Sequence, residues 1–282
     1  MLRWVHQRLK NPRAALREHL GHYELPSFPR LALDAARKLR DPNIPIAEIG
    51  ELLAQDPGLS ASLLRLTNSP AYGLRSEVRN VEHAVALLGR GQTESAVLAA
   101  ATRHALPVRR RRGFDPVDFW RAAARRAMAA KALADVLHPG TASETFTASL
   151  LQDMAVPVLC DSHGERYGAL LERWADGGEV LSDLERSELG VDHAQVGGWI
   201  SQEWSFPARI TDAIGAHHEF RATDSIPPAI GLVAPLRGSA DEAMVEHVVE
   251  IACREFTLPQ EQIRSLLAVA FESADRLAEQ LV

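Results

Sequence analysis

The stretch that decides the fold runs from residue 55 to residue 69 and reads QDPGLSASLLRLTNS. Asp56 and Pro57 are typical of a helix start, because an Asp side chain accepts an orphan backbone N–H and a first-turn proline has none to satisfy. Leucines then recur at helical spacing. Asn68 and Ser69 bond readily to nearby backbone, which suits a helix end. The stretch therefore predicts one amphipathic helix with defined ends.

The rest of the chain continues this helical pattern. Asn80 is expected to cap a helix that Gly89 ends in the left-handed conformation, and Asp115 with Pro116 opens a longer helix. Alternating strand patterns of useful length are absent, so the chain is predicted to be all-α. Further apolar stripes at helical spacing lie near residues 144–156, 165–175, 192–205, 207–219, 227–236, 241–255 and 259–281.

The composition is that of a globular protein: 282 residues, 46% hydrophobic and 24% charged. A net charge of −6 argues against a general nucleic-acid or membrane-surface polycation. The two cysteines, Cys160 and Cys253, exclude a disulfide framework and favour a reducing compartment. No stretch approaches the roughly 18 to 20 apolar residues needed to cross a bilayer. We expect a cytoplasmic protein with no membrane span and no specific nucleic-acid partner.

An arginine-rich segment divides the chain. Residues 107–113 contain Arg109, Arg110, Arg111 and Arg112, and such a like-charge run prefers solvent. The segment is predicted to be a solvated hinge, although its guanidinium groups could also contact phosphate or another anion. The predicted divisions are an N-terminal helical extension at 1–22, an N-terminal helical subdomain at 23–106, the linker at 107–113, a second helical subdomain at 114–222, and C-terminal helices at 223–282.

Several motifs in a fixed order resemble the HDOD family, the HD-related output domains of bacterial signalling proteins. The first half contains ELPSFP at 24–29, DPGL at 56–59, LLRLTNS at 63–69 and AYG at 71–73. The second half contains FW at 119–120, LLQD at 150–153, DHAQVG at 192–197 and AHHE at 216–219. The resemblance implies a two-part helical fold, in which an N-terminal bundle precedes a degenerate HD-like bundle.

The wider HD superfamily consists of metal-dependent phosphohydrolases, whose site is an ordered set of His and Asp ligands. Such ligands hold divalent ions, which generate hydroxide and neutralise phosphoryl charge. Here Ala122 or Ala123 stands where the first His is expected, and residues 230–236 supply no late Asp. The residual HD-like positions are Gln152, Asp153, His193, His217 and His218.

These departures predict no catalytic residue, no metal ligand set and no cofactor. On one helix, His217 and His218 would point about 100° apart, so we expect them not to serve one metal centre. His218 is expected to face solvent beside Glu219. Asp153 is expected to be an internal hydrogen-bond acceptor, for helix ends or for His193.

The sequence therefore favours a non-enzymatic regulatory module that binds a signalling partner protein. Two alternatives stay open: a metal-dependent HD-type phosphohydrolase with altered ligands, and a nucleotide-sensing module that does not hydrolyse its ligand. Trp199 and Trp204 lie five residues apart. One of them is expected in the core and the other at a partner surface.

Overall fold

The computed structural model describes residues 11–74, 76–219, 226–238 and 242–281. Within these ranges all regular structure is helical, apart from isolated bridge positions such as the pair Arg111 and Phe114, which confirms the all-α prediction. Residues 1–10 of the predicted extension at 1–22 lie outside the described residues, and α1 lies in the rest of it.

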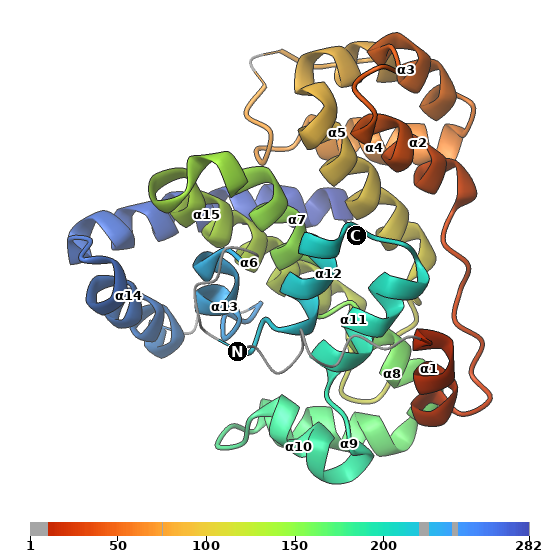
Figure 1. The fold of residues 1–282 in the computed structure, drawn as a ribbon. Coiled ribbons are helices and arrows are strands. Elements are labelled where there is room, and N and C mark those ends of the chain that lie inside the picture. Colours follow the sequence, from red (N-terminus) through yellow and green to blue (C-terminus); the bar gives the residue numbers. More distant parts are fainter. Residues whose placement is uncertain (1–10, 75, 220–225, 239–241, 282) are drawn as a thin grey trace.

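The helices fall into three groups along the chain (Figure 1). The first group is α1 (Pro12–Leu20), α2 (Arg30–Arg40), α3 (Ile46–Ala54), α4 (Pro57–Thr67) and α5 (Val81–Ala105). The second is α6 (Pro116–Leu137), the 3-10 turn η1 (Pro139–Thr141), α7 (Ala142–Leu151), α8 (Ala155–His163), α9 (Glu165–Ala175), α10 (Leu181–Leu189), α11 (His193–Glu203) and α12 (Ala208–Gly215). The third is α13 (Pro228–Val233), α14 (Glu242–Phe256) and α15 (Gln260–Leu281).

Side-chain caps begin the helices where the sequence predicts them. The Asp56 carboxylate accepts the N–H of Leu59 at 3.0 Å, and the Asn80 amide oxygen accepts the N–H of His83 at 2.7 Å. Asp115 caps α6 in the same way. Each cap satisfies a donor that the first helical turn leaves without a partner.

The predicted helix end at Gly89 is wrong. Gly89 does adopt a positive φ of 70°, but the chain resumes its helix at once and α5 continues to Ala105. The residue therefore kinks the helix rather than ending it. The second half of α5 is held inside the core, where every side chain from Ala96 to Ala101 is buried.

The first two groups of helices share one hydrophobic core. Leu63 of α4, Leu98 of α5, and Leu151 of α7 are all fully buried in the same cluster. A second cluster joins α6 to the C-terminal helices through Leu133, Val248 and similar side chains. Helix α15 lies along α6 and ends beside α5, where Arg103 donates a hydrogen bond to the Leu281 carbonyl (Figure 1). The C-terminal helices thus complete the core.

Three of the four arginines in the linker pair with carboxylates. Their side chains are exposed, as expected, but they are not free. The pairs are Arg110 with Asp115 at 2.5 Å, Arg111 with Asp161 at 2.5 Å, and Arg112 with Glu172 at 2.6 Å. Each of the three guanidinium groups thus has a carboxylate partner, and the solvated hinge stays a prediction.

A glycine contact also fastens the linker to α9. The backbones of Gly113 and Gly168 lie so close that a Cβ on Gly168 would stand 2.7 Å from the Arg112 carbonyl oxygen. Gly113 has a φ of 66°, which favours glycine. The segment is therefore packed against the second group of helices.

Both tryptophans of α11 and its end are buried, so the expectation that one faces a partner is wrong. Trp199 is 6% exposed and stacks on His19 with ring centroids 5.4 Å apart. Trp204 is 3% exposed and donates its indole N–H to the Pro26 carbonyl at 3.1 Å. Chain segments that precede α2 cover this face.

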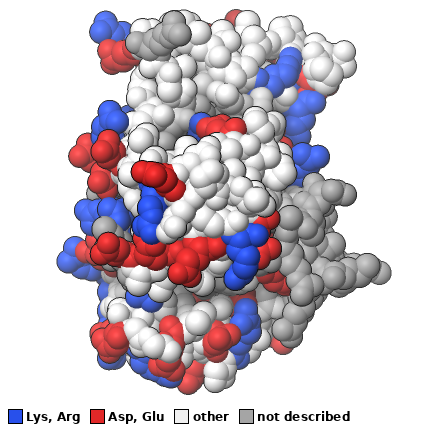
Figure 2. All heavy atoms as spheres, turned by 90° about the vertical axis from the view of Figure 1, so that its left-hand side faces the viewer, with Lys and Arg blue, Asp and Glu red and all other residues white. Residues whose placement is uncertain are grey.

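None of the helices in the described ranges combines the length and the apolar character that a bilayer span requires. The face in Figure 2 carries basic and acidic side chains side by side, and acidic groups form a band across it. Its described residues therefore form no continuous basic surface of the kind that binds nucleic-acid backbones.

Candidate functional site

A cavity of about 1040 Å³ opens between α6, the α9–α10 region, α13 and α14. Four of the five residual HD-like positions line it: Asp153, His193, His217 and His218. Gln152 does not. It is fully buried, and neither its amide oxygen nor its amide nitrogen has a hydrogen-bond partner within the described structure.

Different elements carry the four residues to one point. Asp153 lies in the turn between α7 and α8. His193 is the first residue of α11, where Asp192 and Gln195 form a capping box that fixes the helix start. His217 follows α12, and His218 comes directly after it.

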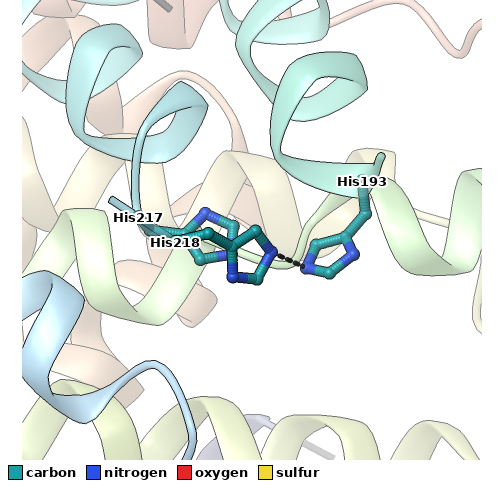
Figure 3. A group of neighbouring side chains, drawn as sticks. All are labelled: His193, His217 and His218. Carbon is teal, nitrogen blue, oxygen red and sulfur yellow. Dashed lines mark hydrogen bonds between the residues drawn. The ribbon is translucent and has the colours of Figure 1, made fainter. Parts of the chain in front are cut away.

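The three imidazole rings converge (Figure 3). The Nε2 atoms of His193 and His218 are 2.9 Å apart, and the available ligand atoms of all three histidines lie within 4.8 Å of one another. The expected divergence of His217 and His218 is wrong, because α12 ends at Gly215 and the two residues lie beyond it. Their ring centroids are 4.0 Å apart. His218 is exposed, as expected, but it also contacts His193.

Acceptors on the far side of two rings set their orientation. His193 Nδ1 lies 2.6 Å from a Glu185 carboxylate oxygen, and the other oxygen accepts the Tyr167 hydroxyl. His217 Nδ1 lies 2.7 Å from the Ile214 carbonyl. In both histidines Nδ1 donates to its oxygen partner. The opposite ring nitrogen, Nε2, therefore points toward the cavity. His217 Nε2 is buried and makes no hydrogen bond within the described structure.

Asp153 joins the cluster through one carboxylate oxygen. Its Oδ1 lies 3.3 Å from His217 Nε2 and 3.5 Å from His193 Nε2. That Asp153 accepts a hydrogen bond from His193 or from helix ends stays a prediction. Its other oxygen, however, has a partner that the sequence did not indicate.

That partner is Arg126 of α6, whose Nη2 lies 2.7 Å from Asp153 Oδ2. Arg126 is 4% exposed, and its Nη1 also donates to the Leu236 carbonyl at 2.9 Å. Arg126 stands one helical turn after Ala122. Ala122 also lines the cavity, as we expected of the position where the resemblance places a first His. The signal in the sequence was an arginine inside the long helix that Asp115 and Pro116 are predicted to open.

Positive and negative groups of the histidine cluster shift one another's pKa values. Burial alone would raise the pKa of Asp153, but the Arg126 guanidinium and contacts from His193 and His217 hold it well below the usual value. Burial opposes a charged His193, yet Glu185 and Asp153 together raise its pKa well above the usual value. His218 lines the cavity, where partial desolvation of its ring and the two neighbouring imidazoles lower its pKa. Arg126 and a protonated His193 thus face two carboxylates.

These residues do not fit a centre of two metal ions. The oxygen of Asp153 that a second ion would need is bonded to Arg126. Ala122, Gln152 and residues 230–236 supply no His or carboxylate at the positions where the resemblance leads us to expect ligands. The Nε2 atoms and Asp153 Oδ1 are of a type that could hold one transition-metal ion, provided that His193 loses its proton.

The fold is that of a helical HD-like domain. The family model for the HDOD domain matches residues 25–220, so the chain belongs to the HDOD family. The match ends before α13, which means that the C-terminal wall of the cavity lies outside it.

Solved structures share this fold at low sequence identity. A candidate phosphohydrolase from Shewanella amazonensis SB2B has a TM-score of 0.74 and 23% identity, over 95% of this chain and 98% of that one. An HDOD domain protein of unknown function from Geobacter sulfurreducens has a TM-score of 0.71 and 21% identity, over 97% and 99%. A candidate signal transduction protein from Marinobacter aquaeolei VT8 has a TM-score of 0.71 and 20% identity, over 96% and 65%.

Among curated proteins, an uncharacterized protein from Treponema pallidum (strain Nichols) is 23% identical over 213 residues. The match spans 75% of this chain and 41% of that protein, so the chain covers less than half of this relative's length.

Proposed function

We propose that this chain is a non-catalytic regulatory module of bacterial signal transduction, which acts in the cytoplasm by binding another protein. The observation that carries the proposal is the ion pair between Arg126 and Asp153. The Arg126 guanidinium pairs with the Asp153 oxygen that a hydrolytic centre would use to bind a metal ion. Without a metal-bound hydroxide, the cluster lacks the nucleophile that phosphohydrolysis of this type requires.

Two further observations support the proposal. The Arg126 contact is fixed from both sides, by Asp153 and by the Leu236 carbonyl, so it belongs to the folded core. One of the proteins of similar fold is a candidate signal transduction protein, which fits a regulatory role for this family.

The test is turnover of a generic phosphodiester, bis(p-nitrophenyl) phosphate, by the full chain with added Mn²⁺, Fe²⁺ or Ni²⁺. The expected rate equals that of Asp153→Asn under the same conditions. Metal-dependent turnover that disappears in Asp153→Asn would show that the proposal is wrong.

The second candidate function is a phosphohydrolase with a single metal ion, as in the candidate phosphohydrolase of similar fold. The observation that favours it is the buried His217 Nε2, which has no hydrogen-bond partner in the described structure and faces Asp153 Oδ1. Calorimetric titration with Zn²⁺ or Ni²⁺ separates the two functions. One tight site that is lost in His217→Ala, together with turnover, would favour the enzyme.

A further inference from the structure

We propose that the part of the cavity outside the histidine cluster binds a small amphipathic anion, with one acidic group on an apolar body. The cavity is at the upper end of the range of about 300–1,000 Å³ seen for small-molecule sites. Much of its wall is apolar or aromatic. The apolar and aromatic side chains that would contact the body of the ligand are Phe119, Leu171, Trp174, Leu232, Met244 and Ile251.

The charges that line the cavity favour a ligand with a single negative charge. The lining contains five arginines, at positions 110, 111, 121, 126 and 237, and four carboxylates, at 115, 118, 153 and 179. Four of the arginines have carboxylate partners, including Arg121 with Asp118 at 2.7 Å and Arg126 with Asp153 at 2.7 Å. One guanidinium is therefore in excess. A ligand with several negative charges would find one guanidinium of the lining without a carboxylate partner in the described structure.

Arg237 is the cation in excess. Its guanidinium lies 4.3 Å from the centroid of the Trp174 ring and donates to the Trp174 carbonyl at 3.3 Å. No carboxylate of the described chain forms an ion pair with it. The cation–π contact holds the charged group beside an aromatic surface. That pairing of a cation with an apolar wall matches an acidic group attached to an apolar body.

Both parts of the chain supply recognition elements: Trp174 lies within the HDOD match, and the cation beside it comes from the C-terminal part. Arg237, Met244 and Ile251 lie beyond residue 220, where the HDOD match ends. A Cβ on Gly238 would stand 3.0 Å from the Asp118 carbonyl oxygen, so the loop that carries Arg237 lies directly on the start of α6. The cation that sets the ligand class therefore comes from a loop that the HDOD match does not include.

The test uses 1-anilinonaphthalene-8-sulfonate, an aromatic body with one sulfonate, and its uncharged counterpart N-phenyl-1-naphthylamine. Fluorescence titration and calorimetry measure affinity and stoichiometry for the full chain. The matched control is Arg254→Gln, which removes an exposed arginine of α14 that pairs with Glu255 outside the cavity lining.

We expect one sulfonate site per chain. Arg237→Gln weakens sulfonate binding by about tenfold or more, the loss of one charged hydrogen bond, and leaves the uncharged probe within about twofold. Arg254→Gln changes neither probe. Arg237→Lys keeps the charge and retains most of the affinity, which covers the case that Arg237→Gln folds poorly.

Equal sulfonate affinity in Arg237→Gln and wild type would overturn the proposal, as would several weak sites. Displacement of the probe separates two ligand classes. Octanoate, an apolar chain with one carboxylate, should displace it better than AMP, and the reverse order would overturn the single-charge assignment in favour of a nucleotide. None of these outcomes bears on whether the histidine cluster hydrolyses phosphodiesters, so the two proposals fail independently.

Discussion

Replacing Arg126 with methionine removes the buried cation beside Asp153 while keeping an unbranched apolar side chain on α6. Breaking a buried ion pair by removing one partner costs about 3–5 kcal/mol, because the remaining charge has lost its counter-ion. Asp153 keeps its contacts with His193 and His217, and its side chain is 19% exposed. For Arg126→Met we therefore expect a cost at the lower end of this range, a loss of about 3 kcal/mol in the free energy of unfolding.

The assay is urea unfolding followed by circular dichroism at pH 7. The control is Arg121→Met on the same helix, which breaks an exposed pair with Asp118 and should cost no more than about 0.5 kcal/mol. Adding Asp153→Asn to Arg126→Met should recover part of the loss, since the uncompensated charge is gone. Equal costs for Arg126→Met and Arg121→Met would refute the account of a buried counter-ion.

Three further predictions concern the linker contact, the histidine cluster and a buried thiol. Gly168→Ala should destabilise the chain by about 2 kcal/mol, because the new Cβ would stand 2.7 Å from the Arg112 carbonyl oxygen. Gly91→Ala, where α5 leaves open space, should be neutral or stabilising by up to about 1 kcal/mol. Urea midpoints in the opposite order would contradict this. NMR titration should show His193 still protonated above its unfolded pKa of about 6.5. Its contribution to stability is then complete below that pH and is lost as the pH rises through the pKa of the folded state. Glu185→Gln should lower the His193 titration midpoint, and a wild-type midpoint at or below about 6.5 would count against the cluster described. Burial raises the pKa of the Cys160 thiol, so thiol reagents should modify it only after unfolding, and rapid labelling of Cys160 in the native protein is the contrary result.

Local sequence signals predicted the helices well, because caps and apolar stripes act within a few residues. Asp56 and Asn80 cap as expected, since their partners are three residues away. Gly89 does have the positive φ that was predicted, but its ψ of −176° is not that of the left-handed helical conformation, and the helix resumes beyond it because the rest of α5 is buried in the core.

The site was harder to predict, because it depends on contacts between distant segments. His217 and His218 converge only because α12 ends two residues before His217, and no cap residue in the sequence marks that end. The Arg126 ion pair joins residues 27 positions apart, on α6 and after α7. Likewise, the linker arginines looked free in the sequence, since the carboxylates that bind Arg111 and Arg112 lie 50 and 60 residues away.

Elemental analysis of the full chain, purified without chelators, tests the central claim most directly. If Arg126 and a protonated His193 already supply the positive charge that Asp153 and Glu185 require, transition metal should be found at well below one ion per chain. One or more ions retained per chain through gel filtration would contradict that claim.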